Sequence, residues 1–167
     1  MNSWLTDRSR RIAFGVPFKN GYTSFLRVLN AQSAPIRIQP NHLKNFPRKV
    51  FIVRHPLDRF LSLWRNKCRD HGKGVAVEGF TMEQLWQRIE EGPEDDHWRR
   101  QVDLLGKYRD KAELVKLESL PDWYYENMQC EFPHENRTEP YDKISDELRD
   151  KILTHYAEDV ELYNAAH

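Results

Sequence analysis

Apolar residues in the first part of the chain occur first as a continuous run and then at helical spacing. Residues 11–17 form a mostly apolar run that ends at Pro17, which predicts a buried strand. In residues 22–31 the apolar positions Phe25, Leu26 and Leu29 share one side of a helix. The pattern therefore predicts an opening unit of strand, glycine-containing loop and helix.

The second strong pattern begins with the apolar run in residues 49–54. Such a run is typical of a strand that is buried on both faces, as in a parallel sheet. Pro56 suits the first turn of a helix, which we expect to reach about Asp70. Arg59, Ser62 and Asn66 lie on a different face of that helix from its apolar stripe.

The rest of the chain continues the alternation of strands and helices. We expect a short strand at 36–38, a helix from a Thr81 cap to Glu91, a strand at 113–117, a helix at 121–128 and a final helix from a Ser145 cap to Tyr163. The alternation predicts one α/β domain over residues 1–167. Its central sheet would be mostly parallel and contain residues 11–17, 49–54 and 113–117.

Composition narrows the class of protein. The chain has 167 residues, of which 12% are aromatic, and this argues against disorder. Its apolar runs are too short to span a membrane, and no charged-then-apolar leader opens it. The two cysteines, Cys68 and Cys130, are too few for a disulfide framework or a zinc site. We therefore expect a cytoplasmic protein without a membrane partner.

The zero net charge hides an asymmetry between the two halves. Residues 1–75 hold 15 Lys and Arg against 3 Asp and Glu, and residues 76–167 hold 11 against 23. The balances are thus +12 and −12. A basic half attracts polyanions such as nucleotides, although the two halves would also neutralise each other across a fold.

The first loop, residues 17–24, carries the chemistry of an anion site. A loop that leads from a strand into a helix presents free backbone N–H groups and the positive end of the helix dipole. Gly21 permits close approach of a ligand, Lys19 adds a charge, and Thr23 and Ser24 add hydroxyls. The spacing differs from the phosphate loop of nucleoside triphosphatases, because here the lysine precedes the glycine.

A second anion site is predicted at the end of the second strand. Arg54 lies at the carboxyl end of that strand, where open α/β sheets bind ligands. Ser62 is two turns into the next helix and leans back toward the same space. Together they would hold a phosphate, whereas the structural alternatives are an Arg54–Asp58 ion pair and a surface hydroxyl.

Taken together, the two motifs resemble the sulfotransferases that use 3′-phosphoadenosine 5′-phosphosulfate. Residues 19–25 resemble the loop for the 5′-phosphosulfate of that donor, and residues 54–62 resemble the motif for its 3′-phosphate. The residues of these motifs are most similar to those of the carbohydrate sulfotransferase branch, which includes heparan sulfate 2-O-sulfotransferase. Three further segments resemble that branch more weakly: residues 97–101, 114–120 and 133–138. The resemblance implies a P-loop-like three-layer fold.

The resemblance also implies roles for individual residues. Arg54 and Ser62 would hold the 3′-phosphate, and Lys19 would neutralise charge on the leaving oxygen without help from a metal. Arg137 would either contact donor or acceptor, or lie in a turn before the last helix. The 5′-phosphosulfate would be bound by the loop residues Lys19, Asn20, Gly21, Tyr22, Thr23 and Ser24.

A base must take the proton of the acceptor hydroxyl, and histidine suits that role near neutral pH. His42 precedes the Arg54 strand, in the segment where relatives of the 2-O-sulfotransferase type carry their base. His97 is the rival, beside Asp95 and Asp96, and His134 is third. We rank His42 slightly ahead of His97.

The leading interpretation is a sulfotransferase with a hydroxyl acceptor, such as a glycan or a small metabolite. The main alternative is a non-catalytic module that binds nucleotides or sulfated glycans. A nucleotide kinase is disfavoured by the missing Gly-Lys-Ser/Thr loop, and nucleic-acid binding by the lack of a reader motif.

Overall fold

The computed structural model describes residues 4–32, 36–38, 40–70, 76–133 and 143–167. Its centre is a five-stranded sheet with strand order β3-β1-β2-β4-β5. The strands are β1 (Trp4–Asp7), β2 (Ile12–Gly15), β3 (Ile36–Ile38), β4 (Arg48–Val53) and β5 (Glu113–Lys116). Strands β2, β4 and β5 are mutually parallel, and β1 is antiparallel to both β2 and β3. Four of the five strands therefore run in one direction.

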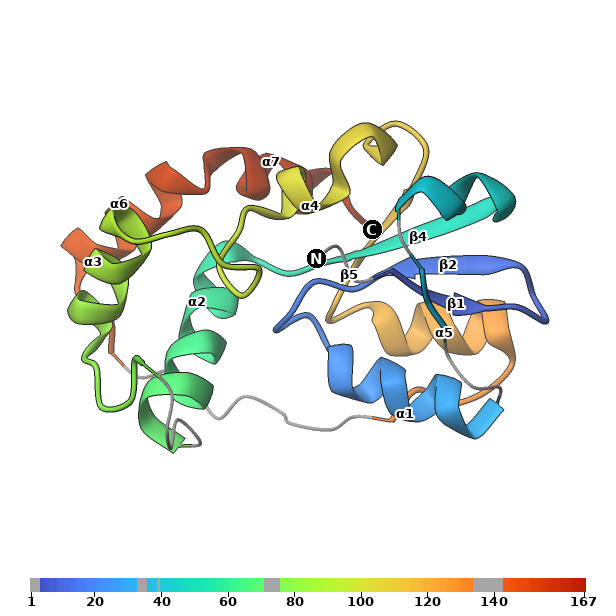
Figure 1. The fold of residues 1–167 in the computed structure, drawn as a ribbon, viewed down its shortest axis with the longest axis horizontal. Coiled ribbons are helices and arrows are strands. Elements are labelled where there is room, and N and C mark those ends of the chain that lie inside the picture. Colours follow the sequence, from blue (N-terminus) through green and yellow to red (C-terminus); the bar gives the residue numbers. More distant parts are fainter. Residues whose placement is uncertain (1–3, 33–35, 39, 71–75, 134–142) are drawn as a thin grey trace.

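Helices cover both faces of this sheet (Figure 1). Helices α1 (Tyr22–Gln32) and α5 (Leu120–Met128) pack on the face that presents Phe14, Val50 and Ile52. The opposite face is covered by α4 (Gln101–Leu105), α7 (Ala157–Ala165) and two 3₁₀ turns, Pro40–Asn45 and Gly106–Tyr108. Neighbouring residues of a strand point to opposite faces, so the continuous apolar run of β4 supplies both layers.

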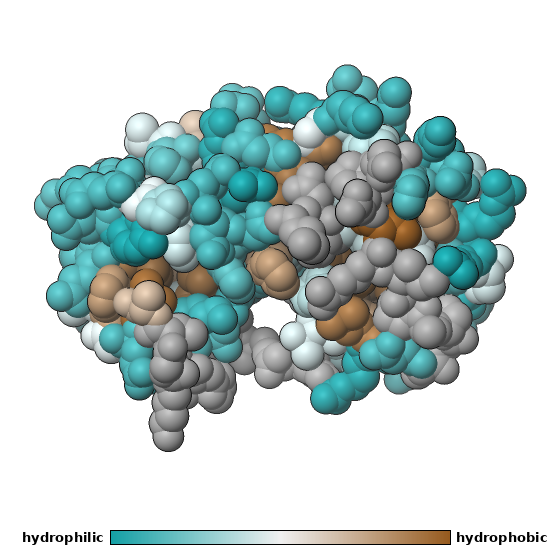
Figure 2. Space-filling view, in the orientation of Figure 1, coloured by the Kyte–Doolittle hydropathy of each residue, from teal (hydrophilic) through white to brown (hydrophobic). Residues whose placement is uncertain are grey.

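A second group of helices extends from the carboxyl end of β4. It consists of α2 (Pro56–Trp64), a π-helical segment (Arg65–Asp70), α3 (Met82–Glu91) and α6 (Asp146–His155). We call this group the helical lobe; its core is a separate apolar cluster that includes Phe60, Leu85 and Ile152. Figure 2 shows a hollow between the helical lobe and the part of the molecule built on the sheet.

The structure confirms the three predicted core strands as parallel neighbours in one sheet. The short strand at 36–38 and the Thr81 cap are also confirmed, the latter as a capping box with Gln84. Two further elements, β1 and α4, have no counterpart in the sequence prediction. Among the residues that the structure describes, no helix is long and apolar enough to cross a membrane.

Two helices differ in detail from the sequence prediction. The helix after Pro56 leaves regular α geometry at Arg65 and continues to Asp70 as a π-helical segment. The predicted final helix is broken at Tyr156, whose backbone has φ −101° and ψ 28°. The Tyr156 hydroxyl donates to the Trp98 carbonyl at 2.6 Å, so a tertiary contact accompanies the break.

Candidate functional site

The loop between β2 and α1 lies at the carboxyl edge of the parallel strands. The Asn20 N–H donates to the Pro17 carbonyl at 3.1 Å, and this bond closes a tight turn. Lys19 has φ 72°, an uncommon left-handed conformation for a residue other than glycine, and Gly21 has φ 80°. Residues held in this way cluster at ligand sites, where the surrounding structure maintains them.

Helix α1 begins directly after this loop and leaves backbone donors at its end. Its first intrahelical bond runs from the Phe25 N–H to the Gly21 carbonyl. The first N–H groups of an α-helix point out of its N-terminal end, and here they belong to residues 22–24. The Thr23 side chain is exposed at this end, whereas Tyr22 and Ser24 are buried. Thr23 is thus the hydroxyl that faces solvent beside the start of the helix.

The ammonium of Lys19 lies at this loop without a carboxylate partner among the described residues. Its Nζ donates to the Oδ1 of Asn66, in the π-helical segment of the helical lobe. Partial burial, together with the nearby charges of Lys67 and Arg54, lowers the pKa of Lys19 to about 8. Lys19 therefore lies close enough to two other cations, Lys67 and Arg54, for their charges to oppose its own.

Arg54 follows the last residue of β4 and reaches the same loop. Its Nη1 donates to the Lys19 carbonyl at 2.7 Å. Burial lowers the pKa of Arg54, and the charges of Asp58 and Glu118 partly oppose this effect. The two motifs that the sequence analysis treated as separate anion sites are thus in direct contact.

Asn20 has an internal role in this arrangement. Its side chain is fully buried, and Nδ2 donates to the Ile52 carbonyl at 2.8 Å and to the Oε1 of Gln101 at 2.6 Å. These bonds fasten the loop to β4 and to the start of α4. Asn20 therefore shapes the loop from within, rather than presenting its side chain to a ligand.

The polar face of α2 divides into buried and accessible residues. Arg59 is only 4% exposed, and its guanidinium donates to the carbonyls of Phe18 and Arg99 at 3.3 and 2.8 Å. Arg59 thus ties the loop to the segment before α4. Ser62, one turn later, is half-buried, and its carbonyl accepts from the Arg65 N–H at the end of α2.

His97 lies against the same loop and is held in a fixed orientation. Its ring stacks on Phe18, with centroids 4.6 Å apart and planes 15° apart. Its Nδ1 is 2.6 Å from the Oδ1 of Asp95, which also accepts the His97 backbone N–H at 2.8 Å. With the Nδ1 proton directed at the carboxylate, Nε2 is left as the basic nitrogen.

Electrostatics keep His97 neutral and Asp95 charged. Burial lowers the pKa of His97, the positive charges of Lys67 and Lys19 lower it further, and Asp95 opposes the change. Burial also acts to raise the pKa of Asp95, but the two hydrogen bonds from His97 outweigh it and leave that pKa lowered. An uncharged imidazole beside an ionised carboxylate is the state that a general base requires.

The structure does not bring His42 to this loop. His42 is exposed, in the 3₁₀ turn that precedes β4, whereas Arg54 follows β4. Strand β4, Arg48–Val53, therefore lies between the two residues along the chain. Of the two histidines, His97 is the one that contacts this loop, and which of them acts as the base stays a prediction. Arg137 and His134 lie outside the described residues.

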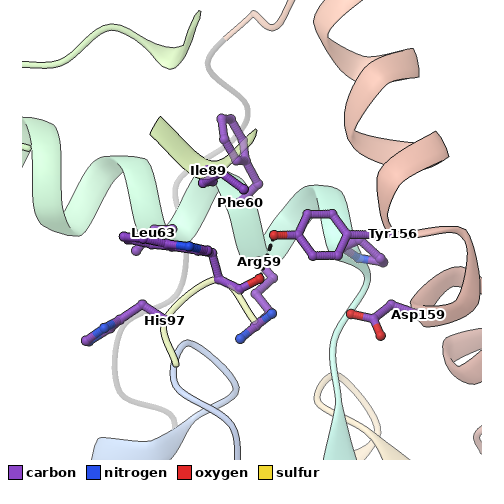
Figure 3. A pocket seen from close by; sticks show the side chains of 9 residues that line it. Arg59, Phe60, Leu63, Ile89, His97, Tyr156 and Asp159 are labelled. Carbon is purple, nitrogen blue, oxygen red and sulfur yellow. Dashed lines mark hydrogen bonds between the residues drawn. The ribbon is translucent and has the colours of Figure 1, made fainter. Parts of the chain in front are cut away.

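A small pocket lies beneath His97, between the helical lobe and the segment before α4 (Figure 3). Arg59, Tyr156 and Asp159 form its polar wall, and Phe60, Leu63 and Ile89 line the rest. Its empty space is about 250 Å³, part of it open to solvent. Pockets that hold ligands of nucleotide size are larger, so we regard it as a packing feature behind the site.

The arrangement fits a multiply charged anion. Backbone N–H groups, Lys19 and Arg54 converge at the carboxyl edge of parallel strands, the usual ligand side of such sheets. The described residues hold no group of three or more His, Cys, Asp or Glu side chains arranged to bind a metal ion. Cationic side chains and backbone donors are the groups that this edge of the sheet offers to an anion.

The sequence analysis assigned no contact at this site to Phe18, Asn66 or Gln101, and it named Asp95 only as a neighbour of His97. Asn66 accepts from Lys19, Phe18 stacks on His97, Asp95 orients His97, and Gln101 joins Asn20 to Arg54. Asn66 lies four residues after Ser62 on the polar face of the helix, and this spacing was the available signal. The contacts of Phe18 and Gln101 depend on tertiary structure and leave no local pattern.

Comparison with known proteins agrees with this geometry. A model of the sulfotransferase family matches residues 7–111, which include the β2–α1 loop, β4, α2 and the segment with His97 and Gln101. No curated protein and no solved structure matches the chain. The family match covers more than half of the chain and contains both segments for which the sequence predicts anion binding, and the chain belongs to the sulfotransferase family.

Proposed function

We propose that the protein transfers a sulfuryl group from 3′-phosphoadenosine 5′-phosphosulfate to a hydroxyl of an acceptor. The observation that carries the proposal is the hydrogen bond between Arg54 Nη1 and the Lys19 carbonyl. It joins a helix N-terminus and two cations into one site for a ligand with phosphates at two positions. A nucleotide with both 5′ and 3′ phosphates matches that arrangement better than a nucleoside triphosphate does.

Each part of the donor would have its own contacts. The backbone N–H groups of residues 22–24 and the Thr23 hydroxyl would hold the 5′-phosphate. The guanidinium of Arg54 and the hydroxyl of Ser62 would hold the 3′-phosphate. Asn20 and Gly21 would contribute through the conformation of the loop, and Tyr22 through packing against Phe18.

The donor supplies an activated sulfuryl group, and the side chains of the protein would promote its transfer. His97 Nε2 would accept the proton of the acceptor hydroxyl as the oxygen–sulfur bond forms. Lys19 would stabilise the negative charge left on the phosphate oxygen as the old sulfur–oxygen bond breaks. The electron pair of that bond leaves with the bisphosphate product.

We further propose one domain with the P-loop-like three-layer arrangement and no requirement for a metal. Helices on both faces of the sheet and the β2–α1 loop support this arrangement. The branch that includes heparan sulfate 2-O-sulfotransferase remains the model for the acceptor, which would then be a glycan hydroxyl. A cytoplasmic location is also part of the proposal.

The second candidate function is a nucleotide- or glycan-binding module without catalysis. The oriented His97–Asp95 pair beside Lys19 favours an enzyme, since ligand binding alone has no use for a neutral, fixed imidazole. The experiment combines a thermal-shift panel with a turnover assay. Stabilisation by adenosine 3′,5′-bisphosphate but not by ATP supports either function. Acceptor-dependent release of the bisphosphate from the donor supports the enzyme, and its absence with a broad acceptor panel supports the binding module.

A further inference from the structure

Gln101 makes an unusual pair of bonds to the backbone of Arg54. Its Oε1 accepts the Arg54 N–H at 3.0 Å, and its Nε2 donates to the Arg54 carbonyl at 2.8 Å. Strand β4 ends one residue earlier, at Val53. The side-chain amide thus pairs with Arg54 as the peptide group of a neighbouring strand would. This contact fixes the backbone from which the guanidinium extends.

The same amide also holds the phosphate-binding loop. Gln101 Oε1 accepts from Asn20 Nδ2 at 2.6 Å, and Asn20 in turn donates to the carbonyl of Ile52. Gln101 and Asn20 are both fully buried. One side chain therefore bridges the Lys19 loop and the Arg54 strand end.

Gln101 is itself anchored by Asp159 of α7. The two carboxylate oxygens of Asp159 accept the backbone N–H groups of Gln101 and Val102 at 2.8 and 2.9 Å. Asp159 is fully buried, and burial raises its pKa while these hydrogen bonds oppose the increase. The start of α4 is thereby fixed to a helix distant in sequence.

We propose that Gln101 is a positioning residue that holds Lys19 and Arg54 in register before the ligand binds. The inference rests on the proposed function, because it assumes that these two cations bind the 5′ and 3′ phosphates. We call the hydrogen bonds of Gln101 to Arg54 and Asn20 the brace. A cation that is already in place costs less entropy to order on binding, so loss of the brace should weaken the affinity for the nucleotide. The loss should be largest for ligands that contact Arg54.

The test compares Gln101→Met with the parent protein by calorimetric titration. Methionine has a similar length and volume but neither donates nor accepts the bonds to Arg54 and Asn20. We expect affinity for adenosine 3′,5′-bisphosphate to fall by about tenfold or more, and affinity for adenosine 5′-monophosphate to fall by less than about threefold. The matched control is Glu113→Gln. This change disturbs the bonds of Glu113 to Arg48 and Trp123 at the opposite edge of the sheet and should leave both affinities unchanged.

A folded Gln101→Met protein with parental affinities, or with equal losses for both ligands, would overturn the proposal. Should the variant fail to fold, hydrogen exchange of the Gln101 side-chain amide in the ligand-free parent decides. Slow exchange supports a brace formed in advance, and unprotected exchange contradicts it. A parent protein that does not distinguish the two nucleotides would instead refute the proposed function, and the exchange measurement would still judge the brace.

Discussion

The guanidinium of Arg54 donates a 2.7 Å hydrogen bond to the backbone carbonyl of Lys19. The two residues are 35 positions apart and belong to different predicted anion-binding motifs. The contact fixes the guanidinium against the loop before α1, so the position of the arginine side chain depends on the shape of that loop.

Replacing Arg54 with alanine should weaken the binding of adenosine 3′,5′-bisphosphate much more than the binding of adenosine 5′-monophosphate. A hydrogen bond to a charged group is worth about 1.5–3 kcal/mol, or roughly a tenfold to a hundredfold change in affinity. Arg48→Ala is the matched control, because Arg48 lies at the opposite end of the same strand, paired with Glu113. Titration of each variant with both nucleotides checks the assignment. Equal losses for the two nucleotides in Arg54→Ala would contradict it.

The affinity for bisphosphate should fall as the pH rises through about 8. In the free protein the pKa of Lys19 is about 8, and a bound anion favours the protonated form. Binding is therefore accompanied by proton uptake above that pH. If Lys19 stays charged in the complex, the dissociation constant rises roughly tenfold between pH 7 and pH 9. Lys19→Ala should abolish this dependence, and a parental profile that is flat over this range would argue against a cationic Lys19 contact.

His97→Ala should reduce turnover by about a hundredfold to ten-thousandfold, the usual contribution of a general base. Bisphosphate affinity should change little, since the imidazole would face the acceptor. His42→Ala is the control, because His42 is exposed at the opposite end of β4. Initial rates and bisphosphate affinities for both variants make the comparison. An inactive His42→Ala variant together with an active His97→Ala variant would instead identify His42 as the base.

Arg59→Met should destabilise the fold without altering the ligand chemistry directly. The change leaves the carbonyls of Phe18 and Arg99 without the donor that satisfies them. Each buried unsatisfied group costs about 1–3 kcal/mol, so the loss of both bonds should lower the free energy of unfolding by roughly 2–6 kcal/mol. Urea denaturation checks this value. Unchanged stability would mean that Arg59 does not connect the loop to the segment before α4.

Much of the fold could be predicted from the sequence because the strands carry strong local patterns. The apolar run in β4 and the Pro17 stop after β2 fix those elements independently of their partners. Strand β1 was missed because Trp4–Asp7 ends in polar Thr6 and Asp7, both buried, with Asp7 bonded to Ser9 and Arg10. Local periodicity does not reveal a polar residue that its neighbours satisfy inside the fold.

The position of the candidate site, like the fold, could be predicted from the sequence only in part. Lys19 and Arg54 belong to local motifs, and the order of strands predicts that they share one edge of the sheet. The choice of histidine depends on tertiary structure. His97 reaches the loop because Arg59 donates to the Arg99 carbonyl and Phe18 stacks on the imidazole. Sequence position relative to β4 does not contain that information.

The proposed site, built by the β2–α1 loop and Arg54, would bind a nucleotide with phosphates at both the 5′ and 3′ positions. Calorimetric titration of the parent protein with adenosine 3′,5′-bisphosphate and with ATP, side by side, measures this preference. We predict one bisphosphate bound per chain, with an affinity at least about tenfold above that for ATP, and loss of this preference in Arg54→Ala. Equal binding of the two nucleotides, or no binding of the bisphosphate, would contradict the account.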